Sequence, residues 1–364
     1  MKNKINILMV SSSSQLGGGT NHMFSLGKNL NKNFEVFYAL PNNKNFSELL
    51  NSRNHIAISE RKINLLDIYK INKFINKNSI DIIHAHGKGA GLISRCTNFF
   101  SKKILIYTFH GIHYECNNLI IKKIYILYER IMGKLDNFKI LVSNSERKFA
   151  ESLNLYLGNN FSIISNGVAD RKIKNFSIDY YPKEEKLNNK KLEVISVCRF
   201  VEQKNISEII KIAMKLPDIN FTIVGEGDLW HKINDLVSKL NLKNVFLIGR
   251  KKNVFEFLYN SDIFLSTSLY EGLPISILEA MSIGLPIVAS KVVGNVDTVE
   301  DGKSGFLYNL YNFDEAAEYI SLLANNPNKR KLMGVKSHER HRDFFSLSNM
   351  INKYQILYES IKKG

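Results

Sequence analysis

Residues Asp262–Ser290, DIFLSTSLYEGLPISILEAMSIGLPIVAS, contain one full strand, loop, helix and strand unit. The two apolar runs Ile263–Ser266 and Pro286–Ala289 are short, as strands buried in a parallel sheet are. Between them, Ile275–Ser282 has the length and apolar character of a packed helix. The stretch therefore predicts a parallel sheet built from βαβ units.

The same alternation of short apolar runs and amphipathic segments extends in both directions from this stretch. The strands predicted before it are Ile5–Val10, Phe34–Ala39, Ile80–His84, Ile104–Phe109, Lys139–Val142, Phe161–Ile164, Glu193–Val197, Asn220–Val224 and Val245–Ile248. The helices predicted between these strands include Asn21–Leu30, Ser145–Leu153, Ser207–Lys215, Leu229–Leu240 and Val254–Tyr259.

The alternation is interrupted by residues 171–190, which are polar, charged and without periodicity. We interpret this segment as a linker between an N-terminal lobe, residues 1–170, and a C-terminal lobe, residues 191–346. A length of 364 residues also favours two cores over one. A last helix, residues 347–362, is expected to pack back on the first lobe. The predicted class is α/β, with two facing, Rossmann-like, doubly wound parallel sheets and a ligand cleft between the lobes.

The net charge of +16 is unevenly distributed along the chain. Residues 1–150 carry 22 Lys and Arg against 9 Asp and Glu, whereas residues 151–364 carry 28 against 25. A basic first lobe indicates an anionic partner, such as a nucleic acid, an acidic membrane surface or a phosphorylated acceptor. The alternative explanation is a coding bias toward Asn, Lys and Ile.

The segment Ile120–Lys134, IIKKIYILYERIMGK, places Lys122, Lys123, Arg130 and Lys134 beside apolar residues on one predicted helix. Such a helix can lie on an anionic membrane, and a buried helix with a basic rim is the alternative. A nucleic-acid-binding protein would interleave aromatic residues with Lys and Arg on an exposed platform. Here the aromatic residues fall mainly in core-like runs, so we expect no nucleic acid partner.

The N-terminal segment has a basic start, but its apolar stretch is too short for a signal peptide and is interrupted by Asn6. No apolar run approaches the ~18 residues of a spanning helix. The three cysteines, Cys96, Cys116 and Cys198, form no CxxC pair, which favours a reducing compartment over a disulfide framework or a zinc site. We therefore expect a cytoplasmic protein.

The loop Ser11–Thr20, SSSSQLGGGT, joins the first strand to the first helix and contains Gly17, Gly18 and Gly19. Glycines allow a close backbone approach to an anion, and the helix start offers free N–H groups. A plain tight turn is the alternative. His22 stands at the third-glycine position of GxGxxG, so the fingerprint of dinucleotide binding is absent.

The segments Asp81–Gly87, DIIHAHG, and Thr108–Gly111, TFHG, each place histidine at the carboxyl end of a strand. This edge holds the ligand in doubly wound folds. We expect His84 and His86 to face opposite sides of their strand, which would not suit a shared metal ion, and His84 to bond a backbone carbonyl. For His110, the residues alone allow either a functional or a structural role.

Ser196–Asn205, SVCRFVEQKN, presents Arg199 at the end of a strand and Lys204 at the expected start of a helix. Two cations beside a helix N-terminus suit a diphosphate. The alternative is a surface turn in which Arg199 pairs with Glu202.

Two further strand ends carry glycine. Gly225 lies in IVGEGD, and Arg250 ends FLIGR. The backbone at these points can shape a nucleotide pocket or simply turn the chain.

Glu271 precedes the helix Ile275–Ser282, and Glu279 lies about one turn inside it. A carboxylate accepts two hydroxyl hydrogen bonds, which suits a vicinal diol of a sugar or a ribose. Apolar neighbours predict partial burial for Glu279, although a solvated helix position is the alternative, and a buried carboxylate needs a partner. The segment that brings backbone N–H groups to the same space comprises Gly272, Leu273, Pro274 and Ile275.

With these motifs the chain resembles the family-4 retaining glycosyltransferases, whose GT-B fold has two facing Rossmann-like lobes. The strongest match is the E-x7-E element from Glu271 to Glu279, within EGLPISILEAM and followed by GLPIVAS. The matches extend from the glycine loop to Gly305 and include Asn166-Gly167-Val168. One departure is Val293-Gly294-Asn295-Val296-Asp297, where the family usually has Gly-Gly-x-x-Glu.

The resemblance implies roles for individual residues. Arg199 and Lys204 would bind the donor diphosphate, Glu271 the sugar hydroxyls and Glu279 the ribose. His110 would lie near the reacting sugar. The other donor contacts it implies are Gly18, Gly19, Gly225, Arg250, Gly272, Leu273, Pro274 and Ile275.

The resemblance further implies a retaining, hexosyltransferase-type enzyme that uses a nucleotide-sugar, most often a UDP-sugar. The acceptor would be a saccharide or a polyprenyl-linked saccharide in the synthesis of a bacterial lipopolysaccharide or capsule, at the inner face of the plasma membrane. Because two cations serve the diphosphate and no DxD element occurs, we expect no metal ion and no other cofactor. A sugar-nucleotide epimerase of the same fold is the rival, but it would need an acid–base set that the sequence does not display.

Overall fold

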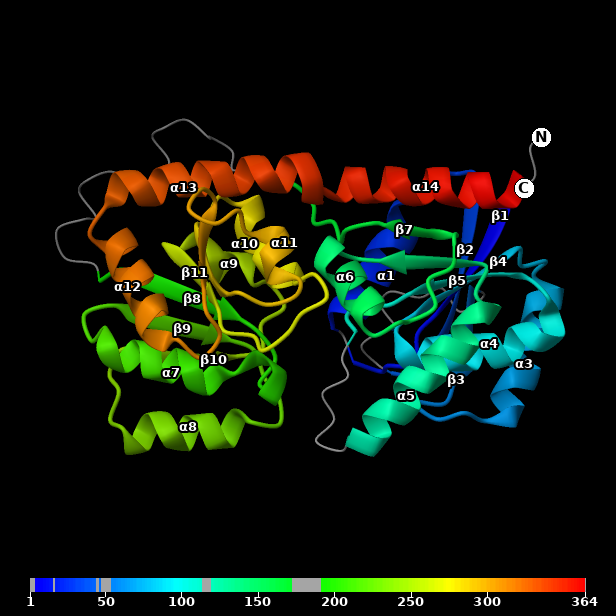
Figure 1. Ribbon diagram of the computed structural model, residues 1–364, viewed down its shortest axis with the longest axis horizontal. Helices are drawn as coiled ribbons and strands as arrows, with labels where there is room; N and C mark the ends of the chain where they lie inside the picture. The colour runs from blue at the N-terminus through cyan, green and yellow to red at the C-terminus, as the bar shows by residue number, and fades with distance from the viewer. Residues whose placement is uncertain are drawn as a thin grey trace. The chain divides into compact units, whose positions relative to one another are not determined.

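The computed structural model describes residues 4–15, 17–43, 46, 54–112, 119–171 and 191–363. The chain forms two compact units: Met1–Asn166 with Ser348–Gly364, and Gly167–Leu347. Each unit contains one parallel sheet surrounded by helices (Figure 1). Apart from Arg171, the linker predicted at residues 171–190 lies outside the described residues.

The first unit contains a seven-stranded parallel sheet in the order β3-β2-β1-β4-β5-β6-β7. Its strands are β1 Ile5–Val10, β2 Phe34–Pro41, β3 His55–Ile58, β4 Ile82–His86, β5 Ile104–Thr108, β6 Phe138–Leu141 and β7 Phe161–Ile163. Its helices are α1 Gly18–Asn29, α3 Leu65–Lys77, α4 Lys88–Ser101, α5 Leu119–Met132, the 3-10 turn η2 Gly133–Leu135, α6 Asn144–Ser152 and α14 Leu347–Lys363, which enters this unit from Ser348.

The second unit contains a six-stranded parallel sheet in the order β10-β9-β8-β11-β12-β13. Its strands are β8 Glu193–Val197, β9 Asn220–Val224, β10 Val245–Gly249, β11 Ile263–Ser266, β12 Ile287–Ser290 and β13 Gly305–Tyr308. Its helices are η5 Glu202–Lys204, α7 Ile206–Lys215, α8 Trp230–Lys239, α9 Phe255–Tyr259, α10 Ile275–Ser282, α11 Asn295–Thr298, α12 Phe313–Ala324, α13 Pro327–Arg340 and the π-helical turn η6 His341–Phe345.

Both sheets reverse their strand order beside the first strand of the unit. In one sheet β1 lies between β2 and β4, and in the other β8 lies between β9 and β11. Loops that leave such a switch point at the carboxyl edge hold the ligand in doubly wound folds. The predicted class, two Rossmann-like parallel-sheet lobes, is confirmed.

The strand expected at Ile80–His84 lies two residues later, at Ile82–His86. The reason is the end of α3: Ser79 has a φ of 48°, and the N–H of Ile80 donates to the carbonyl of Ile75. Ile80 therefore belongs to the helix cap rather than to the strand. Two edge strands, β3 and β13, were not predicted from the sequence.

The last helix, α14, is part of the first unit from Ser348 onward. Its side chains Tyr354 and Tyr358 are fully buried. The Tyr358 ring meets Phe34 of β2 edge to face at a centroid distance of 5.9 Å. The C-terminal end of the chain thus completes the core of its N-terminal unit. No helix of the described ranges has both the length and the hydropathy to cross a membrane.

Candidate active site

Loops at the carboxyl edge of the second sheet are joined by backbone hydrogen bonds. The N–H of Phe200, after β8, donates to Glu226 after β9 over 2.9 Å. The N–H of Glu271, after β11, donates to Val293 after β12 over 3.2 Å. Gln203 links the two groups, because its carbonyl accepts from the N–H of Leu269 over 2.8 Å. These bonds bring the predicted donor-binding loops of this unit together.

Lys204 and Glu271 form an ion pair at the centre of this edge. Their side chains are only 14% and 8% exposed, so the pair is shielded from water on most sides. Ser268 Oγ donates to the same carboxylate oxygen, Glu271 Oε1, over 2.7 Å. Lys204 lies in η5, two residues before α7, rather than at the start of the α-helix as expected. A small pocket next to Lys204 is lined by Cys198, Ser268 and Ser276.

Arg199 lies next to this pair and is exposed. Within the part of the chain that the structure describes, its guanidinium has no hydrogen-bond or ion-pair partner, so the expected alternative of a pair with Glu202 is wrong. A free guanidinium is able to bind an oxyanion in bidentate fashion. Cys198 precedes it, and burial raises the pKa of this thiol to about 12, so it stays protonated at neutral pH.

Glu279 is half-buried in α10, as its apolar neighbours predicted. Burial raises the pKa of its carboxyl from 4.5 to about 7, and the charge of Arg171 opposes this shift. The Arg171 guanidinium itself stacks on the ring of Phe255, 3.9 Å from its centroid. The backbone carbonyl of Glu279 accepts from Ser282 Oγ over 2.7 Å, but its carboxylate accepts no hydrogen bond within the described residues and is therefore available to a ligand.

Two glycines keep these loops close. Gly225 has a φ of 148°, and a Cβ there would lie 1.8 Å from the carbonyl oxygen of Cys198. Gly294 has a φ of 85°, and its Cβ would lie 2.9 Å from the Cβ of Glu271. Larger residues would push apart the loops that carry Arg199 and Glu271.

The other predicted contacts lie at the same edge. Gly272, Leu273 and Pro274 are buried in the loop before α10, and Ile275 is the first residue of that helix. Arg250 pairs with Glu226 over 3.1 Å, with both side chains about half exposed. In the departing segment, Asn295 is buried, and its side-chain amide donates to the Ser290 carbonyl over 3.0 Å. Asn295 therefore holds the loop after β12.

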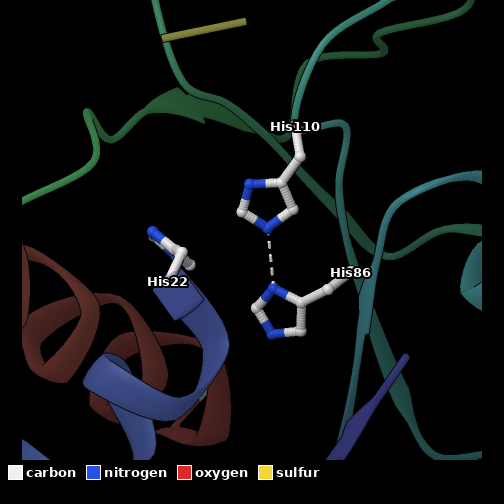
Figure 2. A group of neighbouring side chains, drawn as sticks. All are labelled: His22, His86 and His110. Atoms are coloured by element: carbon white, nitrogen blue, oxygen red, sulfur yellow. Dashed lines mark hydrogen bonds between the residues drawn. The ribbon is translucent and has the colours of Figure 1, made fainter. Parts of the chain in front are cut away.

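In the first unit, three histidines from different elements lie together (Figure 2). His22 comes from α1, His86 ends β4, and His110 follows β5. His86 Nδ1 and His110 Nε2 are 2.9 Å apart and share a hydrogen bond, while His22 Nε2 bonds the hydroxyl of Tyr354 over 3.1 Å. The edge of β4 and β5 thus displays a cluster of imidazoles, which we call the histidine cluster.

His84 and His86 face the same side of β4, because residues two apart in a strand do so. Their ring centroids are 4.0 Å apart, so the expectation of opposite sides is wrong. His84 is structural as predicted, but its partners are hydroxyls rather than a carbonyl: Tyr358 and Thr108, both at 2.7 Å. It joins α14 to the sheet.

His110 has a φ of 57°, in the left-handed region that non-glycine residues rarely adopt. The buried carboxylate of Glu146 holds this turn, because it accepts from the N–H of Gly111 over 2.6 Å and of Val142 over 2.7 Å. The imidazole of His110 packs against the glycine loop: a Cβ on Gly19 would lie 3.5 Å from the ring. Gly18 and Gly19 form the first turn of α1.

The histidine cluster is neutral at physiological pH. Burial lowers the pKa of His22 to about 4 and the pKa values of His84, His86 and His110 well below 6.5. One nitrogen from each of His22, His86 and His110 lies within 4.8 Å of the others, and neutral imidazoles favour ions such as Zn²⁺ and Cu²⁺. The His86–His110 hydrogen bond would have to break for both rings to bind one ion.

Several residues of these sites escaped the analysis of the sequence. Ser268 lies in the quoted stretch Asp262–Ser290 but was given no role there, Arg171 and Glu146 were given none either, and His22 was noted only as a missing glycine. The proximity of His22 to His110 has no local signal, because their positions are 88 apart in the sequence.

Comparisons with known proteins agree with this geometry. Residues 16–172 match the family described as Glycosyltransferase Family 4, and residues 177–340 match Glycosyl transferases group 1. An Escherichia coli UDP-Gal:alpha-D-GlcNAc-diphosphoundecaprenol alpha-1,3-galactosyltransferase is 28% identical over 84% of this chain and 81% of its own. The Staphylococcus aureus capsular polysaccharide biosynthesis glycosyltransferase CapM is 26% identical over 91% of both chains.

Among solved structures, Anabaena Alr3699/HepE in complex with UDP and glucose superimposes with a TM-score of 0.83. It covers 98% of this chain and 100% of its own at 18% identity, which supports the GT-B fold. The two family matches cover nearly all of residues 16–340, which include every predicted site residue and every strand of the two sheets except β1. The chain is a glycosyltransferase and belongs to glycosyltransferase family 4.

Proposed function

We propose that this glycosyltransferase transfers a hexose from a UDP-sugar to a polyprenyl-linked glycan during the synthesis of a cell-surface polysaccharide. The observation that carries the proposal is the carboxyl edge of the second sheet, where hydrogen-bonded loops hold free Arg199 and the pair of Lys204 with Glu271, and where α10 carries half-buried Glu279. The E. coli relative is named for a UDP-sugar donor and a diphosphoundecaprenol-linked acceptor, and the HepE structure contains UDP. Both support this choice of substrates.

In this proposal the diphosphate of the donor binds Arg199 and Lys204. Because Lys204 already pairs with Glu271, the incoming phosphate competes for its ammonium. That competition frees carboxylate lone pairs of Glu271 for the sugar hydroxyls. Glu279 accepts the ribose hydroxyls, which supply the hydrogen bonds that it lacks within the described residues.

We further propose retention of configuration and independence from metal ions. The bond between the anomeric carbon and the diphosphate breaks, the acceptor oxygen attacks from the same face, and the acceptor proton passes to the departing phosphate oxygen. Arg199 and Lys204 stabilise the negative charge on the leaving group. The family resemblance assigns His110 to contact with the sugar, and its neutral imidazole is able to donate or accept one hydrogen bond.

The anomeric configuration of the product tests this mechanism. An α-linked UDP-sugar is expected to give an α-linked product, and the NMR coupling constant of the anomeric proton in the new glycosidic bond measures this. A β-linked product would require a base on the opposite face and would overturn the proposal. A thermal-shift series with UDP-, GDP- and ADP-sugars tests the donor, and the largest shift is expected with UDP.

A further inference from the structure

The helix α5 exposes an unusual number of large apolar side chains. Six apolar side chains between the start of α5 and the end of η2 are 48–68% exposed. A contiguous exposed apolar surface often marks a site of interaction with a protein or a membrane. At ~100° of rotation per residue, four of them form one stripe along the helix. The six are Ile120, Ile121, Ile124, Leu127, Ile131 and Leu135. The four that share one face are Ile120, Ile124, Leu127 and Ile131, which we call the apolar stripe.

The opposite side of α5 is fixed to the core by buried charges. Arg95 of α4 is buried, and its Nη2 donates to Glu129 over 3.0 Å and to Asp136 over 2.7 Å. The hydroxyl of Tyr125 donates to the other oxygen of Glu129 over 2.8 Å. These contacts fix the rotation of α5 about its own axis. Because the side of the helix that carries Glu129 faces the core, the apolar stripe on the other side faces solvent.

The charges around the stripe are of one sign. Glu129 is the only acidic residue from Leu119 to Leu135, and it is occupied by Arg95. Lys123, Arg130 and Lys134 are exposed and lie along one flank of the stripe by helical rotation. An apolar face with a cationic flank matches an anionic bilayer, where acyl chains accept the isoleucines and headgroups accept the cations.

We propose that the apolar stripe docks α5 on the surface of an anionic membrane. This inference deepens the proposed function, on which its choice of a membrane partner rests, because a polyprenyl-linked acceptor is itself held in a bilayer. α5 begins nine residues after His110 in the sequence. Docking of α5 would therefore hold the first unit at the surface from which such an acceptor is presented.

Vesicle binding of the full chain tests the proposal without any need for turnover. Cosedimentation is measured with phosphatidylcholine vesicles that contain phosphatidylglycerol and with pure phosphatidylcholine, at low and at high salt. The wild type is expected to bind the anionic vesicles and to be weakened by salt. Serine at Ile124, Leu127 and Ile131 together is expected to weaken binding at least about tenfold, because three apolar side chains leave the acyl region.

The matched control places serine at Met214, Leu332 and Ile356, which are 50–69% exposed on α7, α13 and α14. It is expected to bind as the wild type does, and thermal melts of both variants check folding. Equal binding by wild type and stripe variant, or no binding by either, would overturn the proposal. So would a concentration-dependent dimer that only the stripe variant loses, because the stripe would then be covered by a second copy. A UDP-induced thermal shift reports separately on the donor site.

Discussion

The two units place side chains of different charge at the carboxyl edge of the same kind of parallel sheet. The first displays the histidine cluster and the neighbouring His84, whose imidazoles are kept neutral because desolvation lowers their pKa values. The second displays Arg199, the ion pair of Lys204 with Glu271, and Glu279. Uncharged groups are suited to hydrogen bonds with a neutral sugar or acceptor, and fixed charges to a diphosphate. The fold is shared, and the loops decide the chemistry.

The largest expected effect follows removal of Arg199. Because its guanidinium has no partner among the described residues, Arg199→Ala is expected to leave the melting temperature unchanged. Turnover is expected to fall by ~10²–10³, the usual cost of one preorganised group at developing charge. The control is Lys232→Ala, which removes an exposed cation from α8. A variant with wild-type kcat would show that charge at this edge does not act on the leaving group.

Glu271→Ala and Glu279→Ala are each expected to reduce turnover at least about tenfold, through loss of diol contacts. Circular dichroism and melting temperature check that each variant folds. Glu271→Ala is expected to cost more stability, because it leaves Lys204 shielded without its partner. Full activity in either folded variant would contradict the donor assignment.

The pH dependence of UDP-sugar binding separates Glu279 from the other donor contacts. With a pKa of about 7, its carboxyl becomes ionised and able to accept two hydroxyl hydrogen bonds as the pH rises from about 6 to 8. Affinity for a UDP-sugar, whose diphosphate is fully ionised throughout this range, is expected to increase several-fold when measured by calorimetry, and to stay flat in Glu279→Gln. A pH profile that is identical in both proteins would contradict this role.

Acid is expected to destabilise the first unit around its histidines and to stabilise the second unit around Glu279. The histidine pKa values are lowered, so these groups stabilise the fold above about pH 6.5, and this stability is lost as the pH falls toward the folded values. The pKa of Glu279 is raised, so its contribution is present below about pH 4.5 and is lost as the pH rises through about 7. Between pH 7 and 5, the protection factors for hydrogen exchange, which correct for the slower intrinsic exchange at lower pH, are expected to fall in β4 and β5 and to rise in α10. A change of protection in the same direction in β4, β5 and α10 would contradict this contrast between the two units.

The smallest expected effect is that of a chelator. Saturating EDTA is expected to leave activity unchanged, because Arg199 and Lys204 provide the positive charge for the diphosphate. Loss of activity that Mg²⁺ or Mn²⁺ restores would contradict the metal-independent donor site. Restoration by Zn²⁺ alone would point instead to the histidine cluster, and His22→Gln would then remove that dependence.

The sequence by itself determined the alternation of strands and helices, the two sheets and the loops that carry the proposed donor residues. These features depend on residues that are close together in the sequence. In the second unit, three predicted strands and one predicted helix match the structure to the residue, among them β8 and α10. The cations and carboxylates also follow strands directly in the chain, so their place at a sheet edge is fixed by topology. The edge strands β3 and β13 were not predicted from the sequence.

Only the tertiary structure decided which distant side chains meet. His22 bonds Tyr354, 332 residues away, and His84 bonds Tyr358, 274 residues away. Glu146 reaches Gly111 over 35 residues, and Lys204 reaches Glu271 over 67. Such contacts have no local signature, because they depend on how helices and strands pack and on which buried polar groups must find partners. The sequence shows which reactive side chains each loop carries, but the fold determines which other side chains they contact.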